Sequence, residues 1–221
     1  MDPLPIQTDY ASWAYTKSGV EDLWVNFDSF FQDYLRAGEI LAQMLPRNKE
    51  FSTRDRLRLI CGMNNKIDEK QKDPVVEALH SNYWKQYYGR CFVHKDVNDC
   101  LPKLARQTKL GVVSNFKIKG GIESILEQFN LRQYFDFVLT SIEIGWRKPN
   151  STIYRTALEK TECLPEEIFF VGDDFDNDVK APLDMGMHAI LLDRRGRYKD
   201  ITSRFKISQF EELEAALQPM V

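Results

Sequence analysis

Four aspartates lie within six residues of one another, in Asp173-Asp174-Phe175-Asp176-Asn177-Asp178, just after the apolar run 168–171. Carboxylates this close repel one another unless a cation lies among them, and magnesium is the usual hard cation for oxygen ligands. Asp173 and Asp178 fit a metal site best, because the first follows the apolar run and the second can open the next helix and face back. A solvated acidic turn with Asp178 as a helix cap fits the same spacing, so both interpretations stay open.

Other polar residues follow other apolar runs. Ser114 and Asn115 come after the run 110–113, and a hydroxyl and an amide there can bind an anion, although they also suit a polar strand exit that caps a helix. Lys148 precedes Pro149, which favours an extended backbone and a lysine side chain that points back across a sheet edge, although such a lysine is usually a surface residue. As a set, the serine, the lysine and the acidic pair predict a phosphate-plus-magnesium site.

A parallel sheet would bring these residues together. Short β-rich runs alternate with helical patterns beyond residue 92, and strands buried on both faces and separated by helices predict a doubly wound parallel α/β sheet. Ligands bind at the carboxyl ends of the strands in such sheets, which is where the polar residues lie. The predicted strands are 110–113, 135–139, 168–171 and 188–192.

The first 92 residues have a helical period instead. Apolar residues at steps of three and four between 20 and 35 predict one long amphipathic helix. Ser52-Thr53-Arg54-Asp55 is a candidate start for a second helix, and Asp73-Pro74 is a candidate start for a third. We therefore expect a mostly helical domain over 1–92 and an α/β domain over 93–221.

The composition limits the class of protein. The 221 residues include 30 basic and 33 acidic side chains, a net charge of −3, which excludes a generally basic protein that tracks a nucleic-acid backbone. We find no secretory signal and no stretch of the ~20 apolar residues that a spanning helix needs. The four cysteines form neither a metal-ligand pattern nor a disulfide framework. We expect a cytoplasmic protein with a small-molecule partner and neither nucleic acid nor membrane; the oligomeric state is not predicted.

Three motifs resemble those of the haloacid dehalogenase-like (HAD) hydrolase superfamily, in the same order and spacing, over about residues 95–215. They are Val112-Val113-Ser114-Asn115, Glu143-x-Gly145-x-x-Lys148-Pro149-x-x-x-Ile153-Tyr154 and Val171-Gly172-Asp173-x-x-x-x-Asp178. The resemblance implies a Rossmann-like core with a helical cap. It also implies a magnesium-dependent phosphatase that acts on a small phosphorylated metabolite through an aspartyl-phosphate, since the acidic third motif resembles the phosphatase branch more than the dehalogenase branch.

The resemblance implies a role for each candidate residue. Ser114 would be a catalytic residue that binds the transferring phosphoryl group, with Asn115 beside it. Lys148, also catalytic, would stabilise the charge of the phosphoryl group and the nucleophile. Asp173 and Asp178 would hold Mg²⁺.

One motif of the superfamily is not found. Its members open with a strand that ends in an Asp-x-Asp-x-Thr-like motif, whose first Asp is the nucleophile and whose second is the general acid or base. Here Asp2 follows no strand, and Asp28 lies within a helical pattern. By resemblance, this strand would be central, between the strands that end at Ser114 and Gly172. Its loss would leave two strands about 10 Å apart, with unpaired backbone groups that cost on the order of 1–3 kcal/mol each when buried.

We therefore expect a start about 10–20 residues upstream, enough for one strand and its turn, and no activity in the sequence as given. The alternative function is a non-catalytic HAD-like domain that binds phosphate or magnesium, or that uses its cap as an interaction surface. The aromatic residues that could form such a surface, although their helical spacing more often marks a core, are Tyr83, Trp84, Tyr87, Tyr88 and Phe92.

Overall fold

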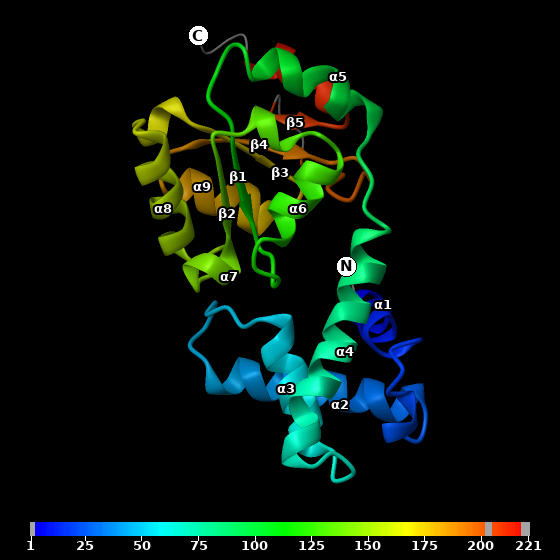
Figure 1. Cartoon of the computed structure of the whole chain (residues 1–221). Coiled ribbons are helices and arrows are strands. Elements are labelled where there is room, and N and C mark those ends of the chain that lie inside the picture. The colour runs from blue at the N-terminus through cyan, green and yellow to red at the C-terminus, as the bar shows by residue number, and fades with distance from the viewer. Residues whose placement is uncertain (1–2, 202–204, 218–221) are drawn as a thin grey trace. The chain divides into compact units, whose positions relative to one another are not determined.

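The computed structural model of the chain describes residues 3–201 and 205–217, and these fall into two compact units, Met1–Phe92 and Val93–Val221. Figure 1 labels the helices and strands of both units. Each unit is described by itself below. Within the described residues, none of the helices combines the length and the apolar character that crossing a membrane requires.

The described part of the first unit is helical. Its elements are α1 (Pro3–Tyr15), the short turn η1 (Glu21–Leu23), α2 (Phe27–Met44), α3 (Thr53–Met63) and α4 (Glu69–Tyr88). Helix α1 packs along α4, and α3 packs against both α2 and α4. Phe30, Leu57 and Leu79 come from three different helices and are fully buried, so they mark the core of this unit.

The single helix predicted between residues 20 and 35 is wrong. The chain forms η1, becomes extended at Trp24, and starts a new helix at Asn26, whose side chain accepts a hydrogen bond from the amide of Ser29 at 2.9 Å. Trp24 stays buried, and its indole donates to Asp33 at 3.1 Å. The apolar period therefore continues through a break in the backbone, and periodicity alone does not reveal that break. Asp28 is an exposed residue in the first turn of α2, as its helical pattern predicted.

The two other predicted helix starts have different outcomes. Ser52 caps α3 as predicted, since its hydroxyl accepts from the amide of Asp55 at 3.0 Å and the Asp55 carboxylate accepts from the amide of Ser52 at 2.8 Å. The predicted start at Asp73-Pro74 is wrong, because α4 begins after Asp68, which caps it by accepting from the amide of Gln71 at 2.9 Å. Pro74 lies inside the helix and forgoes one main-chain hydrogen bond there.

Aromatic residues of α4 pack against α1. The ring of Tyr83 lies 5.8 Å from that of Tyr10, and the ring of Tyr87 lies 5.9 Å from that of Trp13. Tyr83 is buried, whereas Phe92 is largely exposed. Tyr83 and Tyr87 are thus part of a helix interface, as their helical spacing favours.

An ion pair between α3 and α4 should make the first unit sensitive to acid. Hydrogen bonds from Arg54 and Ser81 lower the pKa of Glu77 to about 2. Because the folded-state pKa lies below the ordinary value of 4.5, the stabilisation is present above pH 4.5 and is lost as the pH falls toward 2. Both side chains are about half exposed, so we expect an effect below about 1 kcal/mol.

Thermal melts at pH 6, 4 and 3 of the unchanged protein and of Glu77→Gln measure this effect. The variant should be the less stable at pH 6, and the difference should shrink as the pH falls. Glu39→Gln, at an exposed glutamate of α2, is the control and should show no such convergence. A difference between the Glu77 variant and the unchanged protein that stays constant over this range would contradict the interpretation.

The second unit alternates strands and helices. Its elements, in chain order, are α5 (Lys95–Leu104), β1 (Gly111–Ser114), α6 (Gly121–Gln128), η2 (Arg132–Tyr134), β2 (Phe137–Thr140), α7 (Ser141–Ile144), α8 (Ser151–Thr161), η3 (Pro165–Glu167), β3 (Phe169–Gly172), η4 (Phe175–Lys180), α9 (Ala181–Asp184), β4 (His188–Leu192), β5 (Lys206–Ile207), η5 (Phe210–Glu212) and α10 (Leu213–Leu217). The predicted strands are confirmed, each within two residues of its bounds. The pair of residues in β5 was not predicted, because so short a run has no detectable period.

All strand pairs are parallel, but they form two sheets. One sheet is β1-β2, with Ser114 opposite Thr140, and the other is β3-β4-β5, with Gly172 opposite Leu191. In the described residues, β1 and β3 therefore each pair on one side only. Helix α8 links the two sheets, because its Ile153 and Tyr154 belong to a core cluster against which Val113 of β1 and Phe170 of β3 both pack.

Helices cover both faces of the larger sheet, as a doubly wound fold requires. Along β4, Ala189 and Leu191 pack with Val179 of η4, whereas Ile190 between them packs with Leu104 of α5. Side chains alternate between the two faces of a strand, so η4 and α5 lie on opposite faces. The predicted α/β class with parallel strands is confirmed.

Candidate active site

Lys148 lies where the two sheets approach each other. Its ammonium donates to the carbonyl oxygen of Val113 at 2.9 Å and to Oδ1 of Asp178 at 2.7 Å. The side chains of Lys148 and Asp178 are only 10% and 7% exposed. One buried cation therefore links the end of β1 to the helical turn after β3.

The carbonyl of Val113 faces the unpaired edge of β1. The carbonyl of Leu110 accepts a hydrogen bond from the backbone amide of Asp136, just before β2. The backbone amide and carbonyl of every second residue from Leu110, Val112 included, therefore also face β2. Those of Val113 face the opposite edge, because successive residues of a strand alternate. The Lys148 ammonium thus satisfies a carbonyl that has no strand partner among the described residues.

Asn115 holds the backbone of Lys148. Its Oδ1 accepts from the amide of Lys148 at 2.7 Å, and its Nδ2 donates to the carbonyl of Lys148 at 3.0 Å. Both ends of the Asn115 amide are thereby engaged in placing the lysine. Ser114 is the last residue of β1 and directly follows the carbonyl that Lys148 contacts. The structure thus brings Ser114, Asn115, Lys148 and Asp178 to one place.

The acidic segment 173–178 folds around Gly172. A Cβ on Gly172 would collide with the Asp178 carboxylate, so the glycine lets that carboxylate lie against the end of β3. Oδ2 of Asp178 also accepts from the amide of Asp174 at 3.1 Å. Asp174, not Asp178, caps the following turn by accepting from the amide of Asn177 at 2.9 Å, so the interpretation of Asp178 as the helix cap is wrong.

Asp173 points elsewhere. Nη2 of Arg197 donates to its Oδ2 at 2.7 Å and to its carbonyl at 2.9 Å, and the Asp173 side chain is 71% exposed. In the described part of the chain, no hydrogen bond or ion pair joins Asp173 to Lys148 or to Asp178. The sequence analysis missed Arg197. Its position just after β4, at the same edge as the other strand exits, is the signal that could have found it.

The donor set suits magnesium. Mg²⁺ is typically held by one or two protein carboxylates, with water and substrate phosphate completing an octahedron of oxygens. Asp173 offers exposed carboxylate oxygens, and Asp178 lies in the same segment with a carboxylate for which Gly172 leaves room. Within residues 3–201 and 205–217, no group of three or more His, Cys, Asp or Glu side chains is placed to hold a metal by itself. These two carboxylates would therefore be only part of the coordination shell.

The space at Gly172 gives a direct test of the Asp178 placement. In Gly172→Ala, the new methyl group should push the Asp178 carboxylate away from Lys148, at a cost of about 1–3 kcal/mol in unfolding free energy. Urea unfolding curves measure the change. Gly62→Ala in α3 is the control, since its methyl group would meet nothing within 4 Å and should leave stability equal or slightly higher. Equal effects of the two substitutions would show that Gly172 makes no special room.

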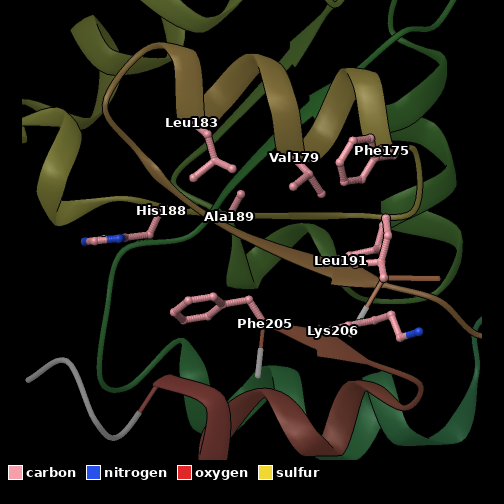
Figure 2. A pocket seen from close by; sticks show the side chains of 9 residues that line it. Phe175, Val179, Leu183, His188, Ala189, Leu191, Phe205 and Lys206 are labelled. Carbon is pink, nitrogen blue, oxygen red and sulfur yellow. The ribbon is translucent and has the colours of Figure 1, made fainter. Parts of the chain in front are cut away.

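An apolar hollow of about 200 Å³ lies next to the acidic segment. Figure 2 shows Phe175 and Val179 of η4 on one side of it, facing Ala189 and Leu191 of β4. Its lining is mostly apolar, with His188 and Lys206 as its polar side chains, and it includes none of the candidate site residues. The hollow therefore stands apart from the polar site around Lys148.

The second unit thus has parallel strands between helices, with a lysine, a serine and two aspartates at the ends of its strands. The family model described as "Haloacid dehalogenase-like hydrolase" matches residues 43–192. The chain belongs to the haloacid dehalogenase-like hydrolase family, which confirms the resemblance found in its motifs.

Individual relatives agree with this family. Over 130 residues, the chain is 42% identical to haloacid dehalogenase-like hydrolase domain-containing protein 3 of Bos taurus. This alignment covers 57% of this chain and 49% of that protein. Over 84 residues, it is 37% identical to glyceraldehyde 3-phosphate phosphatase of Methanothermobacter thermautotrophicus, in an alignment that covers 38% of this chain and 37% of that protein. The chain therefore spans half the length or less of these two curated relatives.

Solved structures share the fold. A 2-haloacid dehalogenase from Pseudomonas syringae superposes with a TM-score of 0.79 at 18% identity, over 100% of this chain and 93% of that one. A HAD phosphatase from Thermococcus onnurineus gives a TM-score of 0.65 at 21% identity, over 97% and 89% of the two chains. At such identities the likeness concerns the fold only.

Proposed function

We propose that this chain carries the phosphate and metal site of a magnesium-dependent phosphohydrolase that acts on a small phosphorylated metabolite. The observation that carries the proposal is the contact of the buried Lys148 ammonium with both the end of β1 and Asp178. A fixed cation beside a strand-end serine is the electrostatic partner that a transferring phosphoryl group needs. Relatives named as phosphatases support the choice of substrate class.

Each residue has a role in this proposal. Ser114 binds the phosphoryl group, Lys148 stabilises its negative charge, and Asn115 fixes the backbone of Lys148. Asp173 and Asp178 hold Mg²⁺, which when bound supplies a Lewis acid for the phosphoryl oxygens. Segment 1–92 is proposed to be the substrate cap.

The nucleophile of the proposed aspartyl-phosphate is assigned to none of the described residues. Asp178, the aspartate that contacts Lys148, has both carboxylate oxygens engaged, one by Lys148 and the other by the amide of Asp174. Among the described residues, Lys148 contacts no other aspartate that could be the nucleophile, and this favours the second candidate function, a non-catalytic domain that binds phosphate and magnesium.

Binding and turnover, measured separately, distinguish the candidates. Calorimetry of this chain with MgCl₂ and inorganic phosphate reports binding. Release of phosphate from a panel of small sugar phosphates, with Mg²⁺ or with EDTA, reports turnover and is measured on the chain extended upstream to include the expected first strand. Binding together with Mg²⁺-dependent turnover, both lost in Lys148→Ala, supports the enzyme. Binding without turnover supports the non-catalytic domain, and the absence of binding refutes both.

A further inference from the structure

The segment 193–198, which follows β4, folds over the acidic segment. Asp193 shapes this turn, since its buried carboxylate accepts from the amides of Arg197 at 2.8 Å and Tyr198 at 3.0 Å. Lys206 of β5 donates to the carbonyl of Tyr198 at 2.8 Å and fixes the end of the turn. Hydrogen bonds with residues of both β4's exit and β5 therefore hold the turn in place next to the acidic segment.

Two side chains of this turn reach the backbone of the acidic segment. The hydroxyl oxygen of Tyr198 accepts from the amide of Phe175 at 3.1 Å, and the hydroxyl donates to the carbonyl of Asp173 at 3.4 Å. Arg197 reaches both the carbonyl and the carboxylate of Asp173. Tyr198 thus hydrogen-bonds only to the backbone of this segment and packs its ring beside that of Phe175, whereas Arg197 brings a positive charge to the carboxylate itself.

The acidic segment needs positive charge when no metal is bound, because four carboxylates within six residues repel one another. Lys148 compensates Asp178 in a buried pair, and Arg197 compensates Asp173 at the surface. The two pairs differ in exposure, since the Arg197 side chain is 31% exposed and can turn into water. Only the Arg197 pair can therefore be exchanged for another cation at low cost.

We propose that Arg197 is a built-in counter-ion, which occupies the carboxylate of Asp173 until a divalent cation displaces it. This inference rests on the proposed function, because it takes Asp173 as a metal ligand. A guanidinium nitrogen 2.7 Å from Oδ2 stands where a cation bound to that oxygen would lie, and two cations cannot share this position without strong repulsion. Binding of the metal at Oδ2 therefore requires Arg197 to leave, and the energy of its ion pair weakens the apparent affinity for a metal at this oxygen.

Titration calorimetry of MgCl₂ into the full chain tests this inference with four proteins: the unchanged chain, Arg197→Gln, Arg197→Lys and Arg195→Gln. Removing the competing charge should lower the Kd for Mg²⁺ about three- to tenfold in Arg197→Gln. Arg197→Lys keeps the charge near Asp173 and should stay close to the unchanged chain. Arg195→Gln makes the same change in net charge at an exposed residue of the same turn. Arg195 forms no ion pair within the described residues, so this substitution should shift the Kd less than about twofold.

The outcomes separate this inference from the proposed function. Magnesium binding that is no tighter in Arg197→Gln than in Arg195→Gln, or that is weaker, overturns the counter-ion role and leaves the metal site standing. Binding as tight in Arg197→Lys as in Arg197→Gln also overturns it, because the charge is then not the cause. If no variant and not even the unchanged chain binds Mg²⁺, the metal site of the proposed function is refuted along with this inference. Circular dichroism of each variant confirms that it is folded.

Discussion

Lys148→Met should lower the unfolding free energy of the second unit by about 3–5 kcal/mol, the cost of removing one partner from a buried ion pair. The substitution leaves the Asp178 carboxylate buried beside an apolar side chain, and it leaves the carbonyl of Val113 without its donor. Methionine keeps most of the length of lysine, so little of the loss comes from a cavity. Urea unfolding followed by circular dichroism measures the change as a shift of the midpoint at constant slope.

A double-mutant cycle assigns this loss to the pair. Asp178→Asn alone leaves the ammonium buried without its counter-ion and should also be costly, but Lys148→Met with Asp178→Asn should be more stable than the sum of the single effects by about 2 kcal/mol or more. Lys95→Met is the matched control, because the Lys95 pair with Asp99 is exposed to solvent and its loss should leave the stability almost unchanged. Additive single effects would show that Lys148 and Asp178 do not depend on each other in solution.

The order of the strands explains why Lys148 and Asp178 could be predicted to lie in one site, although the ion pair between them was not predicted. Parallel strands bring their carboxyl ends to one edge, so residues after β1, β2 and β3 were expected near one another, and Asn115, Lys148 and Asp178 are in contact. That Asp174, and not Asp178, caps the turn could not be predicted. Which of two nearby aspartates caps a turn depends on the backbone of that turn, and composition and spacing do not determine this.

The position of Arg197 just after β4 could have marked it as a candidate, but its partner could not be predicted, for a related reason. Its contact with Asp173 depends on the turn that Asp193 shapes through two amide hydrogen bonds, and these join residues within a segment that has no periodic pattern. In the first unit, the break at Trp24 was missed because a buried indole preserves the apolar period across an extended residue. Hydrophobic spacing therefore predicts which residues are buried better than it predicts where a helix stops.

The division of the strands into two sheets gives Lys148 a second role besides charge compensation. A strand edge that is buried without partners leaves carbonyls unsatisfied, and each costs on the order of 1–3 kcal/mol. The ammonium of Lys148 provides a donor for one such carbonyl, that of Val113, on the edge of β1 that faces away from β2. The same cation that would stabilise a phosphoryl group thus also supports the fold, so activity lost in a Lys148 variant must be interpreted together with the stability of that variant.

Asp173→Asn should separate the metal site from the fold. Its carboxylate is exposed and its one ion pair, with Arg197, lies at the surface, so the unfolding free energy should change by less than about 1 kcal/mol. Loss of a direct carboxylate ligand should nevertheless raise the Kd for Mg²⁺ about 10- to 100-fold or more, since even outer-sphere partners of a metal contribute that much. Titration calorimetry with MgCl₂ measures the affinity, and urea unfolding of the same sample confirms that the variant is folded.

Asp176→Asn is the matched control for this change. Asp176 is exposed, lies in the same segment, and loses the same charge, so it has the same long-range effect on a bound cation. If both variants weakened Mg²⁺ binding equally, the general negative charge of the segment would explain the affinity and Asp173 would not be a ligand. If Mg²⁺ affinity falls strongly in Asp173→Asn alone, with stability unchanged, Asp173, which directly follows β3, is a ligand of the metal.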